Sequence, residues 1–122
     1  MRDLRVLVCG SRNWTDHKSI WRLLNRLRTE ATNISVIEGC AQGADYAAHE
    51  WIAPGVEIYH FPADWDRYGK GAGPIRNQQM LDEGKPDFVM AFTEDLANSK
   101  GTKDMVSRAR RAGLTVLIFG HK

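Results

Sequence analysis

Several features that would assign a functional class are missing from this sequence of 122 residues. It has only two cysteines, Cys9 and Cys40, and they form no CxxC pair, so we expect reduced thiols and no cysteine-based metal site. No apolar run approaches the about 18 residues of a membrane span. The stretch MRDLRVLVCG at the N-terminus lacks the pattern of a signal peptide. We therefore expect a cytoplasmic protein with no membrane partner.

Strong charge and the common nucleotide fingerprints are also absent. The formal net charge is +2, which permits an anionic ligand but does not indicate a protein that coats DNA. Neither GxGxxG nor GxxxxGKS/T occurs, which argues against an NAD dehydrogenase and against a P-loop NTPase. The four histidines, His17, His49, His60 and His121, have no metal-ligand spacing along the chain. We therefore expect neither a metal site nor a cofactor.

The sequence does contain a regular alternation of strand and helix patterns. Asp16 is a plausible N-cap for the first helix, Pro74 fits the first turn of the third after a long loop over 62–73, and Gly113 ends the last. Short apolar runs typical of buried parallel strands occur at 4–10, 34–39, 56–61, 87–92 and 114–120. Helical patterns occupy 16–31, 43–53, 74–84 and 101–113.

This alternation predicts a single domain over residues 1–122. The expected fold is a Rossmann-like three-layer α/β/α sandwich. Its five-stranded, mainly parallel sheet should have the strand order 3-2-1-4-5. In such sheets the ligand crevice lies beyond the carboxyl ends of the strands, where the strand order reverses.

The stretch YGKGAGPIRNQQM (68–80) suggests what such a crevice would bind. It places three glycines, a lysine and an arginine around one proline. Glycine lets backbone N–H groups approach a phosphate, and Lys70 or Arg76 could neutralise it. A plain crossover loop that runs into a helix is the alternative. Because four separate segments deliver Gly, Ser, Thr, Lys or Arg to the same edge, we favour an anion-binding cradle.

In this hypothesis the helix N-termini at Gly43, Pro74 and Gly101 face the phosphates, with Lys70 and Arg76 as counter-charges. The predicted ligand-binding residues are Gly10, Ser11, Arg12, Gly39, Gly43, Ala44, Asp45, Asp64, Trp65, Lys70, Gly73, Pro74, Arg76, Asn77, Gly101 and Thr102.

Some of these side chains have a second interpretation. Arg12 could bind the ligand or form an ion pair with Asp16 or Asp45. Trp14 and Trp65 both follow strand ends, and each could stack on a base or pack in the core. The basic residues near the end of the last helix fit the helix dipole better than they fit nucleic-acid binding.

Four motifs carry a resemblance to a known family. GSRNW (10–14), GCAQGAD (39–45), PADWDRYGKGAGPIRNQQM (62–80) and SKGTKDMV (99–106) resemble the SLOG superfamily in its YspA/YpsA-related branch. The resemblance covers essentially the whole chain. It implies a Rossmann-type nucleotide-binding fold related to the DNA-processing protein DprA and to the LOG cytokinin-activating enzymes. Many members, especially those of phages and mobile elements, are thought to sense or process nucleotide-derived ligands.

The resemblance to LOG enzymes is partial. Arg76 matches their arginine, and Gly101 and Thr102 match the glycine and threonine of PGGxGTxxE. Met105, however, stands at the position of the glutamate that works with the arginine in cleaving an N-glycosidic bond. Asp104 is one residue early, which turns it about 100° around the helix. The second loop has Gln42 where many relatives have arginine.

The leading hypothesis is therefore binding of a nucleotide or nucleotide-derived ligand, such as an ADP-ribose-like molecule or a nucleoside phosphate, for sensing or processing. An alternative is phosphoribohydrolase-like hydrolysis, with Arg76 and Asp104 as catalytic residues or Asp45 as the carboxylate. A second alternative is DprA-like binding of single-stranded DNA. The sequence leaves a homo-oligomer open.

Overall fold

The computed structural model describes residues 3–39, 43–51 and 56–120. Its centre is a five-stranded sheet of order β3-β2-β1-β4-β5, in which every neighbouring pair is parallel. The strands are β1 (Asp3–Gly10), β2 (Asn33–Glu38), β3 (Glu57–His60), β4 (Phe88–Phe92) and β5 (Thr115–Phe119). The predicted strand order and the Rossmann-like class are confirmed.

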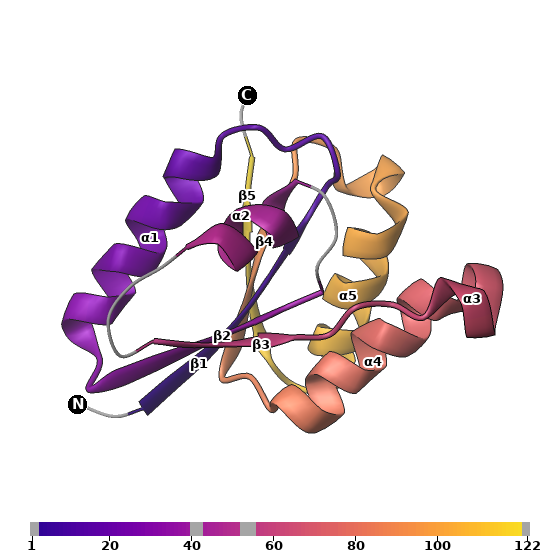
Figure 1. Cartoon of the computed structure of the whole chain (residues 1–122). Helices are drawn as coiled ribbons and strands as arrows, with labels where there is room; N and C mark the ends of the chain where they lie inside the picture. Colours follow the sequence, from indigo (N-terminus) through magenta and orange to yellow (C-terminus); the bar gives the residue numbers. More distant parts are fainter. Residues whose placement is uncertain (1–2, 40–42, 52–55, 121–122) are drawn as a thin grey trace.

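Helices cover both faces of this sheet, with α1 and α2 on one side and α4 and α5 on the other (Figure 1). None of the helices in these described ranges is long and apolar enough to cross a membrane. The helices are α1 (His17–Glu30), α2 (Ala44–Glu50), α3 (Trp65–Tyr68), α4 (Ala72–Gly84) and α5 (Lys100–Arg111), with single 3₁₀ turns η1 (Gly69–Gly71) and η2 (Leu96–Asn98).

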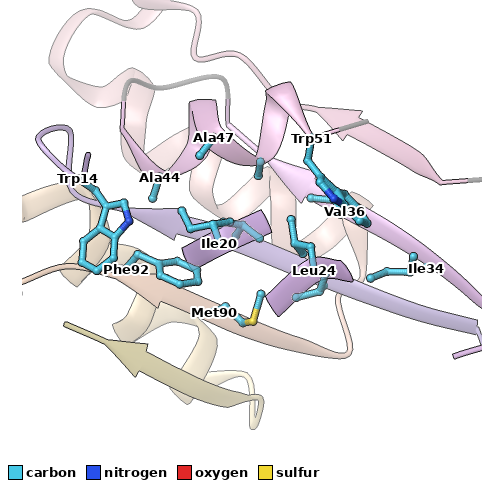
Figure 2. Packing of buried hydrophobic residues seen from close by; sticks show 13 residues of the cluster. Trp14, Ile20, Leu24, Ile34, Val36, Ala44, Ala47, Trp51, Met90 and Phe92 are labelled. Carbon is cyan, nitrogen blue, oxygen red and sulfur yellow. The ribbon is translucent and has the colours of Figure 1, made fainter. Parts of the chain in front are cut away.

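The core consists of two apolar layers, one on each face of the sheet. Successive strand residues point to opposite faces, so Val6 and Val8 of β1 pack under α1 and α2. Leu7 and Cys9 of the same strand pack under α4 and α5. Figure 2 shows the first layer, where buried side chains of α1 meet those of β1, β2 and β4. A central strand buried on both faces explains why the apolar stretch at 4–10 is continuous and buried over residues 6–9.

The ends of the helices follow from local residues. The Asp16 carboxylate accepts a hydrogen bond from the backbone N–H of Ser19, which confirms the predicted N-cap of α1. The expected long loop over 62–73 instead contains α3 and η1, so α4 begins at Ala72 and Pro74 is its third residue. Asp64 caps α3 through the N–H of Arg67, and a helix of four residues has no apolar period by which it could be predicted.

Candidate functional site

The first four strands end at one edge of the parallel sheet, the edge at which the polar segments were expected. The register pairs Gly10 at the end of β1 with Phe92 at the end of β4. It likewise pairs Glu38 at the end of β2 with His60 at the end of β3. Residues that follow these four positions therefore leave the sheet side by side.

Two glycines let the loop after β1 pack against the start of α2. Gly43 has a φ of +77°, and a Cβ there would lie 2.1 Å from the carbonyl oxygen of Ser11. A Cβ at Gly10 would lie 2.3 Å from the carbonyl oxygen of Phe92 and 2.5 Å from the Cβ of Ala44. Close packing alone thus requires glycine at both positions. Contact of Gly10, Ser11, Gly43 or Ala44 with a ligand stays a prediction.

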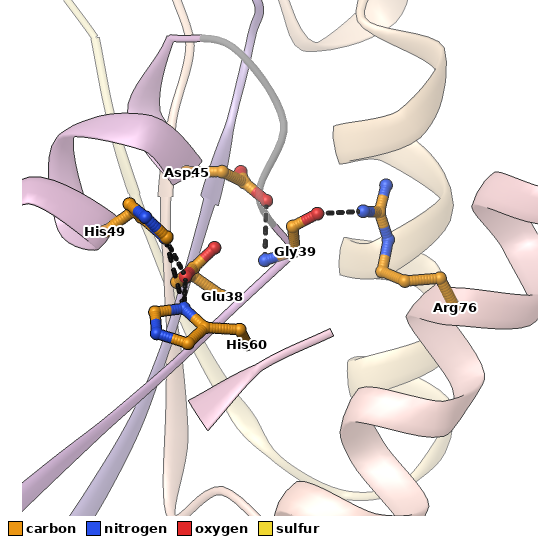
Figure 3. Close-up of polar contacts among 6 residues, drawn as sticks. All are labelled: Glu38, Gly39, Asp45, His49, His60 and Arg76. Atoms are coloured by element: carbon orange, nitrogen blue, oxygen red, sulfur yellow. Dashed lines mark hydrogen bonds and ion pairs between the residues drawn. The ribbon is translucent and has the colours of Figure 1, made fainter. Parts of the chain in front are cut away.

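The best-defined polar centre of the edge is formed by Gly39, Asp45 and Arg76 (Figure 3). The backbone N–H of Gly39 donates to Oδ2 of Asp45 over 3.0 Å. Nη1 of Arg76 donates to the carbonyl oxygen of Gly39 over 2.6 Å. A Cβ on residue 39 would lie 2.4 Å from that Nη1 and 2.9 Å from that Oδ2, so a glycine is needed here for both side chains to reach the backbone.

The carboxyl group of Asp45 is almost completely buried, since only 4 % of the residue is exposed. Burial raises the pKa of Asp45 from 3.8 to about 7, and the Arg76 charge and the Gly39 N–H oppose that rise. Near neutral pH this carboxyl group is therefore only partly ionised. A group in this state can act as a hydrogen-bond donor as well as an acceptor.

Asn77 connects Arg76 to the first turn of α5. Its Oδ1 accepts from Nε of Arg76 over 3.1 Å, and its Nδ2 donates to the carbonyl oxygen of Gly101 over 3.2 Å. The same Nδ2 lies 3.0 Å from Oδ2 of Asp104, which also accepts from Nε of Arg108 over 2.8 Å. The structure thus brings Gly39, Asp45, Arg76 and Asn77 into one hydrogen-bonded network that continues into α5.

The N-terminal turn of α5 is open to an approaching group. Ser99 stands at the N-cap without a side-chain hydrogen bond to the helix, because its hydroxyl lies between Thr93 and the carbonyl oxygen of Asp95. Gly101 is exposed, and a Cβ placed there would meet no other atom within 4 Å. Thr102, which was also expected to bind the ligand, is buried, with 4 % of its surface exposed.

The two neighbours on α5 that bear on hydrolysis face different surroundings. Met105, at the glutamate position of LOG enzymes, is fully buried in the apolar layer beneath α4 and α5. Asp104 is partly exposed, and its Oδ2 is held by Asn77 and Arg108. A glutamate at position 105 would therefore lie in the core of this protein.

Other predicted site residues lie on the outside of the molecule. Lys70 is exposed, and the Asp64 carboxylate caps α3. Trp65 is half exposed, and its ring lies 3.5 Å from where a Cβ would stand at Gly73. The α3 segment lies beyond α4 at the periphery (Figure 1). In the described part of the chain no hydrogen bond or ion pair joins these side chains to Arg76. Their role in binding stays a prediction.

The structure bears on the alternatives for two residues of the first loop, and ligand binding by Arg12 stays a prediction. Trp14 is 4 % exposed and packs edge-on against Phe92, with ring centroids 5.6 Å apart, so it belongs to the core. Arg12 is exposed and has no ion-pair partner in the described ranges, so the suggested pairs with Asp16 and Asp45 are not formed. Its guanidinium group remains available.

The thiol groups provide no nucleophile in the described part of the chain. Cys9 is a free, buried cysteine, and burial raises the pKa of its thiol well above the ordinary value of 9.0. A neutral, buried thiol is a poor nucleophile. Cys40 and Gln42, both considered above, lie outside the described residues.

A contact among three side chains at this edge was not predicted from the sequence. Nδ1 of His49 and Nδ1 of His60 both contact Oε2 of the fully buried Glu38, the former over 2.9 Å (Figure 3). The two histidines lie 11 positions apart with no ligand spacing. The sequence feature that could have indicated this contact is that Glu38 and His60 lie at the ends of neighbouring strands.

A polar hollow of about 440 Å³ lies at the opposite, amino edge of the sheet. Three of the groups that line it are held by other parts of the protein. The backbone N–H of Arg5 donates to Asp87, Nε of Arg5 donates to the carbonyl oxygen of Gly84, and Asn33 donates to Asp3. The glycine and arginine motifs lie at the other edge, where the parallel strands end, and we therefore place the candidate site at the carboxyl edge.

Comparison with known proteins identifies the family of the chain. The model of a family described as the YspA, cpYpsA-related SLOG family matches residues 4–68, just over half of the chain. The Gene 61 protein of Mycobacterium phage D29 is 37 % identical over 129 residues, an alignment that covers 97 % of this chain and 98 % of that protein. The chain belongs to the YspA, cpYpsA-related SLOG family.

The family match covers only part of the candidate site. It includes Gly39 and Asp45 but ends before Lys70, Arg76 and Gly101. Membership in a SLOG family suggests a nucleotide-related ligand for binding or processing. The phage origin of this relative is consistent with the resemblance noted from the motifs, which includes many proteins of phages.

Proposed function

We propose that this SLOG protein binds a nucleotide-derived ligand, such as an ADP-ribose-like molecule or a nucleoside phosphate, at the carboxyl edge of its sheet. The observation that carries the proposal is the link from Arg76 through Asn77 to the first turn of α5. A fixed guanidinium group and an uncapped helix N-terminus both favour an anion, and here a single side chain holds the two together.

Arg76 is arranged to hold a phosphate without moving. Two of its nitrogens are used, Nη1 by Gly39 and Nε by Asn77, which orients the planar group. Its Nη2 makes no hydrogen bond within the described residues. An oriented guanidinium loses less side-chain entropy on binding than a flexible one, and this increases affinity.

The state of Asp45 also suits an anion. A permanently charged carboxylate next to the cradle would repel phosphate, but a group with a pKa of about 7 can take up a proton when phosphate binds. We therefore expect ligand affinity to increase as the pH falls from 8 to 6, accompanied by proton uptake.

The test is isothermal titration with ADP-ribose, AMP and ribose 5-phosphate, preceded by mass spectrometry of any ligand released on denaturation. Gly101→Ala is the sharpest variant, because its methyl group enters open space in the protein but blocks the approach to α5. We expect unchanged or slightly higher stability, since alanine favours helix by up to about 1 kcal/mol, and binding weakened about tenfold or more.

Ser107→Ala, an exposed position farther along α5, is the matched control and should bind like the unmodified protein. Equal binding by Gly101→Ala would remove α5 from the site. Binding that requires oligonucleotides and rises with their length would instead support the single-stranded DNA alternative.

Hydrolysis of an N-glycosidic bond remains the second candidate, and the pKa of Asp45 is the observation in its favour. General acids work best when their pKa lies near the working pH. Asp45 meets that condition, and the Gly39 peptide links it to Arg76. Release of free base from a nucleoside monophosphate, lost in Asp45→Asn, would establish this activity.

A further inference from the structure

Three potential metal ligands converge at the carboxyl ends of β2 and β3. Glu38 is the last residue of β2, His60 is the last residue of β3, and His49 lies in the last turn of α2. Oε2 of Glu38 lies 2.9 Å from Nδ1 of His49 and also contacts Nδ1 of His60. The two Nδ1 atoms lie 3.1 Å apart. In Figure 3 both rings point toward the carboxylate.

This geometry places three electron-pair donors around one point. In the neutral tautomers an imidazole Nδ1 either carries a hydrogen or presents a lone pair. If both nitrogens carry hydrogens that point at Oε2, two N–H groups lie 3.1 Å apart and repel each other. A cation among the three atoms would interact favourably with all of them.

Two of the three distances suit a small transition-metal ion, and the third, the close contact of Glu38 Oε2 with Nδ1 of His60, has to widen more. Tetrahedral Zn²⁺ with bonds of 2.0–2.1 Å holds its ligand atoms about 3.3 Å apart. The N–N distance of 3.1 Å and the N–O distance of 2.9 Å need to widen by only a few tenths of an ångström. Two imidazoles and one carboxylate favour Zn²⁺ or a related ion, whereas Mg²⁺ and Ca²⁺ prefer oxygen ligands alone.

The burial of the three side chains suits a site that loads from solvent. The Glu38 side chain is 0 % exposed, while those of His49 and His60 are 39 % and 45 % exposed. The carboxylate is thus fixed by the sheet, and the imidazoles form the solvent side. His49 is also stacked on Tyr46 with an interplanar angle of 9°, which limits rotation of its ring.

We propose that Glu38 Oε2, His49 Nδ1 and His60 Nδ1 bind one divalent transition-metal ion of the zinc class. Three protein ligands leave a fourth position for water or another ligand, the arrangement of catalytic rather than purely structural zinc sites. The site adjoins the candidate ligand centre, because Glu38 directly precedes the Gly39 peptide that Asp45 and Arg76 bind. The proposal does not depend on nucleotide binding.

The experiment is a titration of tag-free, chelator-treated protein with Zn²⁺ alone, in competition with a chromophoric chelator. Co²⁺ is then added to a second sample, because four-coordinate Co²⁺ absorbs strongly in the visible range. We expect one equivalent of tightly bound Zn²⁺ and a Co²⁺ spectrum that Zn²⁺ abolishes. Loss of a direct ligand should exceed the roughly 10–100-fold effect of an outer-shell change, so His49→Asn and His60→Asn should each weaken binding about 100-fold or more.

The matched controls are the other two histidines of the chain. His17→Asn and His121→Asn should leave the Zn²⁺ affinity unchanged. Circular dichroism should show that the His49 and His60 variants stay folded, since both side chains are partly exposed. Glu38→Gln should also bind Zn²⁺ more weakly. Because Glu38 is buried, this variant tests the proposal only if circular dichroism shows that it is folded. Absence of stoichiometric Zn²⁺ binding, or equal affinity in the double variant His49→Asn/His60→Asn, would overturn the proposal.

Discussion

Asp45 and Asp104 are both connected to Arg76, the first through the peptide of Gly39 and the second through the side chain of Asn77. Asp45 is buried, accepts a backbone N–H and has a raised pKa of about 7. Asp104 is partly exposed and forms an ion pair with Arg108 within its own helix.

The difference shows how depth of burial divides roles between two carboxyl groups. Both belong to one network around one arginine, yet only Asp45 loses nearly all of its hydration on folding and depends on hydrogen bonds inside the protein. A group in that position responds to any charge brought nearby, whereas a partly hydrated ion pair responds little. Asp45 is therefore the group of the two that should sense a bound phosphate.

The largest effect should come from placing a carboxylate beside Asp104, at Met105. Met105→Glu would bury a charged or newly protonated carboxyl group in the apolar layer, at a cost of about 4 kcal/mol or more. Urea denaturation measures the loss, and Met105→Leu should cost less than about 1.5 kcal/mol. If Met105→Glu were as stable as Met105→Leu, this position would have to turn toward the edge rather than the core.

The next effect concerns the pH dependence that Asp45 produces. The folded chain keeps this proton up to about pH 7 and the unfolded chain only to about 3.8, so the folded state binds more protons in between. The free energy of unfolding should therefore fall as the pH rises from about 4 to 7, by about 4 kcal/mol at most, and change little above.

Asp45→Asn provides the reference for this pH profile, because its Oδ1 can still accept from Gly39. The measurement is urea denaturation at several pH values for both proteins. Subtracting the variant cancels the titration of groups that the two share. A difference that stays constant between pH 4 and 8 would show that Asp45 has an ordinary pKa.

A smaller effect is expected from removing the arginine that the two carboxyl groups share. Arg76→Ala should lower the free energy of unfolding by about 2–3 kcal/mol at pH 8. The variant loses the hydrogen bonds to Gly39 and Asn77, and a bond to a charged group contributes about 1.5–3 kcal/mol. It also loses the charge that opposes the raised pKa of Asp45, but protonation of Asp45 limits that part of the loss. At pH 5 the loss should be smaller, since Asp45 is then already protonated.

The control is Arg22→Ala, which removes the same charge from an exposed position of α1. In the Asp45→Asn background the cost of Arg76→Ala should shrink, because the buried charge is gone. Equal costs in both backgrounds would mean that Arg76 stabilises the fold only through Gly39 and Asn77.

Most of the fold could be predicted because the apolar residues of each long helix or strand recur with the spacing typical of that element. The spacing of apolar residues marks α1, and continuous apolar runs mark β1 and β4 as central strands. The segment over 62–73 could not be predicted in the same way. Its α3 helix is held by a local cap at Asp64 rather than by an apolar face.

The site was predictable in part, for a related reason. The glycine after the second strand and the arginine of the stretch 68–80 indicated Gly39 and Arg76, and the fold brings these two together with Asn77. The depth of Asp45 and the contact of Glu38 with two histidines depend on how α2 packs on the sheet. Such distances follow from tertiary packing, which no spacing along the chain expresses.

The smallest structural effect should come from Asp104→Asn. The variant keeps the shape of the side chain and loses one partly exposed ion pair to Arg108. The free energy of unfolding should therefore fall by about 0.5–1 kcal/mol. Asn77 and Arg108 both donate to Oδ2 of this carboxylate, so that oxygen is engaged within the protein and Asp104 is poorly placed to activate water. We therefore expect no release of free base from AMP, GMP, CMP or UMP above background in either protein, and equal affinity for AMP in both. Chromatographic detection of free base and calorimetric titration measure these two quantities. Base release by the unmodified protein that disappears in Asp104→Asn but persists in Asp45→Asn would reverse the comparison, because it would make the partly exposed carboxylate the catalytic one.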